Sequence, residues 1–235
     1  KILTGWQVRP ADRDKPFAMT FDPARHEPGP KMFLGRKIPE GGRDELDQVL
    51  DIVAVHPRTA RHISFKLARY FIDDAPPLDM VEAMTNRFLD TDGDITAVLD
   101  IMLSHPESWN PQARKVLLPE DWGISAVGIT GEARPESVQQ VRLASIAMGH
   151  RVYAARSPKG WDDTRAAWLT PEAVLMRSGW AGPLYGSFVT KPDLEVMMST
   201  YLRAAPDDII RLVRGAPTPE SAFSVAVASP YFNLR

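Results

Sequence analysis

The sequence predicts an all-α fold, a multi-helix orthogonal or bundle-like domain with a small β-hairpin near the N-terminus. Three features predict it: apolar residues at helical spacing along most of the chain, proline–glutamate pairs that begin helices, and prolines that end them. Strand-like alternation is confined to the first part of the chain. There, residues 17–21 and 32–34 are expected to pair as a hairpin.

Four proline–glutamate pairs mark the starts of later helices, at 119–120, 135–136, 171–172 and 219–220. Proline suits the first helical position because its missing N–H would be unpaired there. The following glutamate faces the positive end of the helix dipole. Thr170 and Thr218 precede two of these pairs, where a hydroxyl can cap a free amide. The expected later helices cover about 119–130, 136–148, 171–180, 192–204, 207–214 and 219–228.

Four earlier segments also have helical spacing: 46–53, 57–71, 79–88 and 95–102. His56-Pro57 and His105-Pro106 separate helical runs, because the residue before proline avoids the α region. In the segment 57–71, one third of the helix circumference is apolar and is expected to be buried. This stripe consists of Ala60, Ile63, Leu67, Tyr70 and Phe71.

The domain organisation expected is a single helical domain over residues 1–235. Residues 1–40 form a loop and hairpin entry, 41–110 a first helical group, and 111–235 a second. The chain opens at Lys1 without an initiator Met or a signal-peptide pattern. We therefore expect it to be the C-terminal portion of a longer chain.

Composition excludes several function classes. The formal net charge is −2, so bulk attraction to nucleic acid is not expected. The chain has no cysteine, which excludes thiol catalysis, disulfides and thiolate metal sites. No apolar stretch approaches the roughly 20 residues that a transmembrane helix needs.

Asp90, Asp92 and Asp94 alternate around Gly93, as ligands do in a calcium loop. An EF-hand loop also needs glycine at position 6 and glutamate at position 12, and neither register of this segment supplies both. A turn needs only Gly93 for an unusual backbone angle and an aspartate to cap the next helix. We therefore predict a turn and a helix cap.

Several segments, taken in order, resemble an uncharacterised bacterial family, the domain of unknown function 1800. They are "LTGW" (3–6), "FDPARHEPGPKMFLG" (21–35), "HPRTARHISFKLARYF" (56–71), "DGDITAVLDIMLSHPESW" (92–109), "SPKGWDDTRAAWLTPEAVLMR" (157–177) and "ASPYF" (228–232). The resemblance spans nearly the whole chain. It implies that an N-terminal portion of the usual domain is missing here.

The resemblance also carries expectations about the setting of the protein. Members are typically bacterial, often exported, and frequently encoded beside sulfatase-like proteins. The resemblance therefore implies an extracytoplasmic location, periplasmic or secreted, and a possible sulfatase-like partner. The family brings no established catalytic residues, so none is carried over.

The helix expected over 57–71 has a cationic face opposite its apolar stripe, with Phe65 among the cations. This face consists of Arg58, Arg61, His62, Lys66 and Arg69. Guanidinium groups suit planar oxyanions, so the face is a candidate site for a carboxylate, sulfate or phosphate group. The alternative is a solvated face whose side chains shield Phe65 or pair with acids on a neighbouring helix.

The loop over residues 151–170 is a second candidate. Trp161 and Trp168 lie in it beside Asp162 and Asp163. Indoles beside acids and bases are the materials of a carbohydrate or small-ligand cleft. Tryptophans also commonly anchor a loop to a core, and this second interpretation is favoured.

The sequence favours a non-catalytic binding or assembly module for an anionic or carbohydrate ligand or a partner protein. The alternative is a hydrolase of anionic polymers or sugars, with His26 and Asp162 or Asp163 as its acid–base residues. The five histidines include no HExxH or HxH pair, so we predict no metal and no cofactor. A composite site of His26, Glu27 and a distant acid stays open as an alternative.

Overall fold

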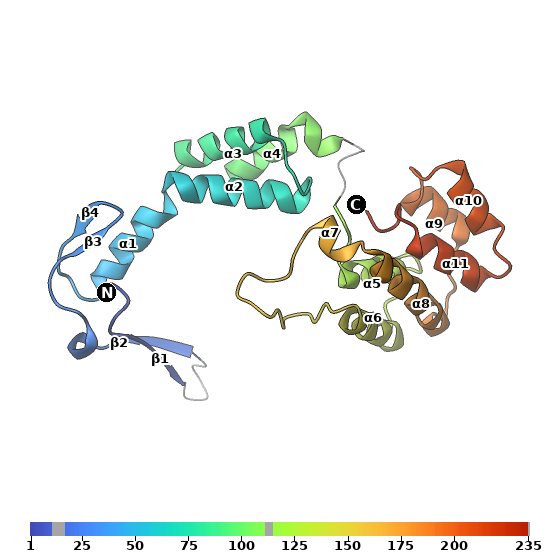
Figure 1. Ribbon diagram of the computed structural model, residues 1–235, viewed down its shortest axis with the longest axis horizontal. Coiled ribbons are helices and arrows are strands. Elements are labelled where there is room, and N and C mark those ends of the chain that lie inside the picture. Colours follow the sequence, from blue (N-terminus) through green and yellow to red (C-terminus); the bar gives the residue numbers. More distant parts are fainter. Residues whose placement is uncertain (11–16, 111–114, 235) are drawn as a thin grey trace. The chain divides into compact units, whose positions relative to one another are not determined.

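The computed structural model describes residues 1–10, 17–110 and 115–234. Within these ranges it contains eleven α-helices and four short strands, so the all-α prediction is confirmed (Figure 1). The elements of the N-terminal half are β1 (Trp6–Pro10), β2 (Phe17–Phe21), η1 (Pro23–Arg25), β3 (Lys31–Phe33), β4 (Arg36–Ile38), α1 (Asp44–Ala54), α2 (Pro57–Phe71), α3 (Leu78–Asp90), α4 (Ile95–Ser104) and η2 (Pro106–Trp109). Those of the C-terminal half are α5 (Pro119–Gly128), α6 (Pro135–Ala147), α7 (Arg165–Trp168), α8 (Pro171–Ser187), α9 (Leu194–Tyr201), α10 (Asp207–Arg214) and α11 (Pro219–Ala228).

The chain forms two compact units. The first comprises Lys1–Leu67 and Pro77–His105, and the second comprises Ala68–Pro76 and Pro106–Arg235. The division predicted from the sequence, with boundaries after residues 40 and 110, stays a prediction. In the part of the chain that the structure describes, no helix is both long and apolar enough for a membrane span.

The strands of the first unit form two separate antiparallel hairpins. Trp6 lies opposite Phe21 in the β1–β2 hairpin, and Lys31 lies opposite Ile38 in the β3–β4 hairpin. The predicted pairing of residues 17–21 with 32–34 is therefore wrong. Each strand pairs with its nearest neighbour in sequence, because a short connection closes at a lower entropic cost.

The tight turn between β3 and β4 explains why this pairing was not predicted. Leu34 and Gly35 both have positive φ, 47° and 76°. Two successive residues with positive φ are the requirement of a type I′ turn, one of the two common two-residue hairpin turns. Leucine rarely adopts this conformation, so Leu34 gave no turn signal in the sequence.

The segment before α4 is a turn and a helix cap, as predicted. The Asp94 carboxylate accepts hydrogen bonds from the backbone N–H groups of Thr96 and Ala97, at 2.9 and 3.3 Å. Gly93 has a φ of +92°, a conformation that favours glycine. Asp94 therefore satisfies two of the free amides at the start of α4.

The buried face of α2 differs from the predicted stripe. Ala60 is buried as expected, but Tyr70 and Phe71 are 42% and 54% exposed. The fully buried line instead runs through Ala60, Ser64 and Ala68, at i, i+4 and i+8. Small side chains on one helical line permit close packing, so the helix buries its smallest residues rather than its most apolar ones.

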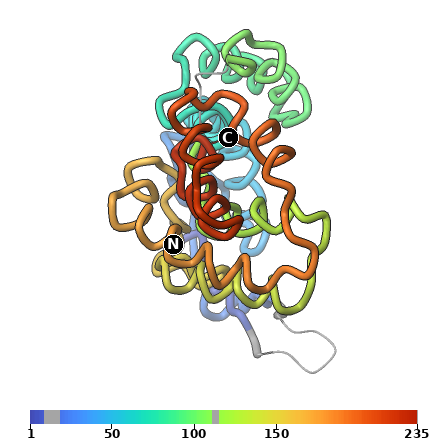
Figure 2. Tube along the Cα trace, turned by 90° about the vertical axis from the view of Figure 1, so that its right-hand side faces the viewer, coloured from blue at the N-terminus to red at the C-terminus, as the bar shows by residue number. Residues whose placement is uncertain are grey.

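The second unit has an apolar helical core. Its largest fully buried apolar side chains are Trp122, Phe223 and Phe232, all at most 1% exposed. The Trp122 indole Nε1 donates to the carbonyl oxygen of Val227 at 2.9 Å, which joins α5 to α11. The helices α8 and α11 contact one another, and both belong to the orange-to-red C-terminal part of the trace (Figure 2).

The four proline–glutamate pairs all begin helices, with proline in the first turn of α5, α6, α8 and α11. Thr170 and Thr218 cap α8 and α11 through their hydroxyl oxygens, which confirms that part of the prediction. The helix α8 is longer than predicted and continues through Pro183 to Ser187. Burial of Ala181 and Leu184 on either side of Pro183 keeps the helix intact despite one missing N–H.

The two ends of the segment 115–234 are joined. Val116 and Leu234 form an antiparallel β-bridge, and the Leu117 N–H donates to the Asn233 carbonyl oxygen at 2.8 Å. The fully buried Arg177 guanidinium donates to Asn233 Oδ1 at 2.5 Å and to the Leu117 carbonyl oxygen at 2.8 Å. Burial lowers the pKa of Arg177 to about 10, so it remains a cation at neutral pH. We call these contacts the terminal clasp.

Candidate functional site

His26, the predicted acid–base residue, belongs to a buried polar cluster of the first unit. Its Nδ1 lies 2.8 Å from the Thr4 carbonyl oxygen, and its Nε2 lies 2.9 Å from Lys31 Nζ and 3.1 Å from Glu45 Oε2. Lys31 Nζ also donates to Glu45 Oε1 at 2.8 Å and to the Glu27 carbonyl oxygen at 2.6 Å. We call His26, Lys31 and Glu45 the polar cluster.

Both ring nitrogens of His26 have contacts within or beside the polar cluster. A carbonyl oxygen only accepts, so Nδ1 carries the proton toward Thr4. The other nitrogen, Nε2, faces the ammonium group of Lys31 and the carboxylate of Glu45. His26 therefore links three segments, and its predicted role as an acid or base stays a prediction.

Glu45 is the anionic centre of this cluster and is fully buried. Burial by itself raises the pKa of a carboxyl group. Hydrogen bonds from Lys31 and from the Gly41 backbone N–H, together with the charge of Lys31, outweigh burial here and lower the pKa of Glu45 to about 2. The carboxylate is thus held ionised beside α1, where it ties β3 to the helix. The sequence did not indicate this residue, because its partner is 14 positions away.

The cationic face of α2 is divided between the two units. Arg58, Arg61 and His62 belong to the first unit and are exposed. Lys66 is exposed as well, and the interleaved Phe65 is half-buried. An anion-binding role for this face stays a prediction.

Arg69 belongs to the second unit and has an acid partner there. Its Nη2 lies 2.9 Å from Asp163 Oδ1. Arg69 therefore pairs with an acid, but this acid lies in the loop before α7 and not on a neighbouring helix, as the alternative had expected. The Lys115 ammonium contacts the same loop, because it donates to the Asp163 carbonyl oxygen at 2.6 Å. It also pairs with Asp74.

The two tryptophans of the loop 151–170 are anchored by the loop itself. The Trp168 indole donates to the Asp162 carbonyl oxygen at 2.5 Å, and the Trp161 indole donates to the Arg151 carbonyl oxygen at 3.2 Å. The two rings meet edge to face, with centroids 6.2 Å apart. This geometry supports the anchoring interpretation, and a ligand-binding role for either indole stays a prediction.

The acids of the same loop are also paired. Asp162 lies 2.8 Å from Lys159 Nζ at the surface, and Asp163 pairs with Arg69. Both acids belong to the second unit, whereas His26 belongs to the first. No unit thus contains the complete histidine–aspartate set of the hydrolase alternative.

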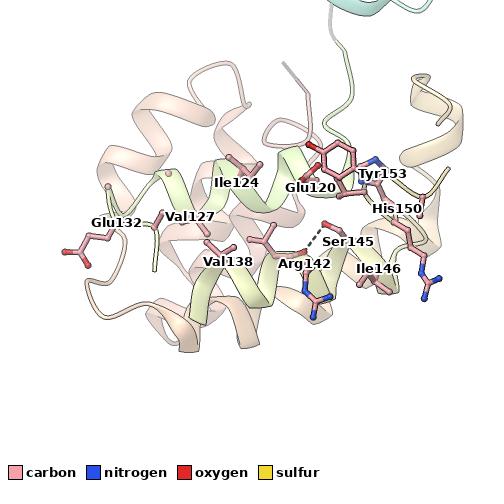
Figure 3. A pocket seen from close by; sticks show the side chains of 17 residues that line it. Glu120, Ile124, Val127, Glu132, Val138, Arg142, Ser145, Ile146, His150 and Tyr153 are labelled. Atoms are coloured by element: carbon pink, nitrogen blue, oxygen red, sulfur yellow. Dashed lines mark hydrogen bonds between the residues drawn. The ribbon is translucent and has the colours of Figure 1, made fainter. Parts of the chain in front are cut away.

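A groove in the second unit provides a site that the sequence did not indicate. It has a volume of about 1060 Å³ and lies along α5, α6 and the segment after α6 (Figure 3). Apolar side chains dominate its lining: Ile124, Val127, Val138, Val141, Ile146, Val152 and Tyr153. Ile124 and Val138 are 57% and 55% exposed, so the groove presents apolar surface to solvent.

The floor of the groove depends on the close approach of α5 and α6. A Cβ atom at Gly123 would lie 2.7 Å from Val141 Cγ1, which is closer than such atoms approach. Glycine at this position therefore lets the two helices meet behind the groove. Val141 is 7% exposed and forms part of the lining at this depth.

His150 lies at one end of the groove and is 4% exposed. Its ring packs against Trp161 and Trp168, with centroid distances of 5.5 and 5.4 Å. Its Nδ1 has no hydrogen-bond partner among the described residues. Burial lowers the pKa of His150, against the opposing effect of the charges on Glu120 and Asp121. The imidazole is therefore neutral at neutral pH, with an unmade hydrogen bond.

Metal-binding side chains do not gather in the residues that the structure describes. No group of three or more His, Asp or Glu side chains there is placed to hold a metal ion. Glu27, the residue of the composite-site alternative, instead forms an exposed ion pair with Lys1 at 2.6 Å.

Comparisons with known proteins agree with the family resemblance. No curated protein and no solved structure matches this chain. One family model, described as "Protein of unknown function (DUF1800)", matches residues 1–234. The chain therefore belongs to the family of the domain of unknown function 1800.

Proposed function

We propose that this chain is a non-catalytic binding module whose ligand is an elongated apolar small molecule held in the groove along α5 and α6. The observation that carries the proposal is the groove itself. Its volume of about 1060 Å³ and mostly apolar lining are typical of small-molecule sites. Such sites also contain a few polar groups that orient the ligand, and Glu120 and His150 supply them here.

Binding rather than hydrolysis is supported by the state of the candidate acid–base residues. The His26 side chain is 6% exposed and contacts Thr4, Lys31 and Glu45. The carboxylate of Asp163 is occupied by Arg69. A general acid or base must reach its substrate within hydrogen-bond distance, and these contacts would have to break first.

The sequence-based interpretation also named other ligands, a partner and a location for the module. An anionic or carbohydrate ligand, a sulfatase-like partner and an extracytoplasmic location remain predictions. The exposed apolar surface of Ile124 and Val138 favours an apolar ligand over a carbohydrate at this groove. An anionic ligand on the cationic face of α2 is compatible with this proposal, because the two surfaces are distinct sets of residues.

Binding of N-phenyl-1-naphthylamine, a neutral apolar dye whose fluorescence rises in apolar surroundings, tests the proposal. We expect saturable binding to the whole chain and at least a tenfold weaker affinity for Val138→Asp. Val138 is 55% exposed, so this change removes groove surface without entering the core. The matched control is Leu175→Asp, at an exposed position of α8 that does not line the groove.

Two results would contradict the proposal. One is the absence of saturable dye binding to the folded wild-type chain. The other is an equal loss of affinity in the Val138 and Leu175 variants, which would place the dye outside the groove. Far-ultraviolet circular dichroism of both variants checks that each retains its helices.

A further inference from the structure

One end of the groove is polar, and its charges indicate which chemical group a ligand would place there. Glu120, His150 and Tyr153 gather at this end (Figure 3). Glu132 lies at the opposite end, with Ile124, Val127 and Val138 between. The groove is therefore long, apolar in the middle and different at its two ends.

Glu120 is the acidic group of this polar end. It follows Pro119 in the first turn of α5 and is half-buried. No ion pair joins it to a cation among the residues that the structure describes. A half-buried carboxylate without a cation attracts a positive or hydrogen-bond-donating group and repels an anion.

His150 does not offset this negative charge. It is neutral at neutral pH, and the charges of Glu120 and Asp121 both act on its ring. A neutral imidazole has one nitrogen that donates and one that accepts. The ring thus adds hydrogen-bonding capacity to this end of the groove without adding positive charge.

The arginines of the groove are placed differently. Arg142 lines the groove but extends away from Glu120 (Figure 3). Its Nε donates to Gln139 Oε1 at 3.2 Å. Arg151 also lines this part of the groove and is exposed to solvent. An exposed cation is screened by water and salt, so it counters a half-buried carboxylate only weakly.

We infer that the ligand is an apolar chain that ends in a hydrogen-bond donor, a hydroxyl or an amine, placed between Glu120 and His150. A chain that ends in a carboxylate is excluded by the same charges. This inference rests on the proposed function, since it names the ligand class for the same groove. It goes further, because an apolar groove alone would accept both kinds of chain.

The experiment compares three probes of equal chain length, 1-decanol, decylamine and decanoate, on the whole chain at pH 7.5. Each is titrated below the concentration at which it forms micelles, with displacement of N-phenyl-1-naphthylamine as the readout. We expect 1-decanol and decylamine to displace the dye at least tenfold more effectively than decanoate. Decanoate as effective as the other two, or more effective, overturns the inference.

Two variants test whether the difference in displacement between decanoate and the other two probes arises in the groove. Glu120→Gln removes the negative charge at the polar end and is expected to reduce the tenfold difference to about threefold or less. Glu136→Gln removes an exposed acid that follows Pro135 in the first turn of α6 and does not line the groove, and it is expected to leave the difference unchanged. A difference that survives in the folded Glu120→Gln variant overturns the assignment to Glu120.

The outcomes also separate this inference from the proposed function. Dye binding without discrimination among the three probes rejects the donor end group and leaves the groove as a binding site. Failure of the dye and of every probe to bind the wild-type chain rejects the proposed function itself. The wild-type comparison needs no variant, so it stands even where a substitution prevents folding.

Discussion

The fully buried charged side chains of the two units, Glu45 in the first and Arg177 in the second, have different kinds of partner. In the first unit, Glu45 and Lys31 are buried together as an ion pair, with His26 beside them. In the second unit, the fully buried Arg177 donates to two neutral oxygens among the described residues, those of Asn233 and Leu117. A buried ion pair depends on both partners, whereas a cation bonded to neutral groups depends on hydrogen-bond geometry alone.

The difference follows from what surrounds each charge. The polar cluster joins loops and short strands to α1, and the buried apolar residues described up to Ala54 are Ile38 and Val49. The second unit has an apolar core around Trp122 and Phe223, so Arg177 adds to a structure that is already packed. The first unit should therefore lose more stability when Glu45 is replaced than the second unit loses when Arg177 is replaced.

The largest expected effect is the loss of Glu45. In Glu45→Gln the buried Lys31 loses its counter-charge, and breaking a buried pair in this way costs about 3–5 kcal/mol. The measurement is urea unfolding followed by the ¹⁹F signal of fluorinated Trp6, the one tryptophan in residues 1–105. Asp47→Asn, an exposed neutralisation on the same helix, is the control and should change stability little. Equal stability of the two variants would contradict the role given to the polar cluster.

A smaller effect is expected for the buried cation of the second unit. Arg177→Met keeps an apolar side chain in the core but leaves Asn233 Oδ1 and the Leu117 carbonyl oxygen without a donor. The expected cost is about 2 kcal/mol. Unfolding is followed by the ¹⁹F signal of Trp122, which lies in this core, with exposed Arg211→Met as the control. A loss larger than that of Glu45→Gln would reverse the comparison between the units.

The smallest effect concerns pH, and it should separate the units without any change in sequence. His150 has a lowered pKa in the folded chain, so the unfolded chain binds its proton first and stability falls as pH drops below the ordinary value of 6.5. Glu45 has a pKa lowered from 4.5 to about 2, so its contribution is lost only between those values. Acid titration should therefore weaken the second unit at a higher pH than the polar cluster.

The same ¹⁹F signals test this order. Stability read at Trp122 should begin to fall near pH 6.5, and His150→Gln should reduce that slope. The signal of Trp6 should respond only below about pH 4.5. A slope at Trp122 that is unchanged in the His150 variant would show that other groups control it.

The helices could be predicted from sequence because their signals are local. Proline at the first position and threonine before it act on the nearest amides, so Thr170 and Thr218 identified the starts of α8 and α11. The α2 stripe was partly wrong because hydrophobicity was used to choose its buried face, while packing selected the small Ser64 and Ala68. Which face of a helix is buried depends on the shape of the neighbouring helices. The periodicity of the helix's own sequence does not contain that information.

The candidate site could not be predicted for a related reason. Glu120 was recognised only as a favourable charge at a helix start, and Ile124 and Val138 only as members of separate helices. Their common groove arises from the contact of α5 with α6 at Gly123 and Val141. The partnership of Lys31 with Glu45 is likewise a product of the fold, since nothing in either segment specifies the other.

The terminal clasp determines how the second unit would respond to mechanical load. Val116 and Leu234 lie side by side, so tension applied through the two flanking stretches of backbone would act on this bridge first. Such a load would open the few bonds between residues 116–117 and 233–234 one after another before any helix stretched. Pulling on these two ends should therefore begin with a weak, early rupture at the clasp, followed by a separate, stronger one in the helical core.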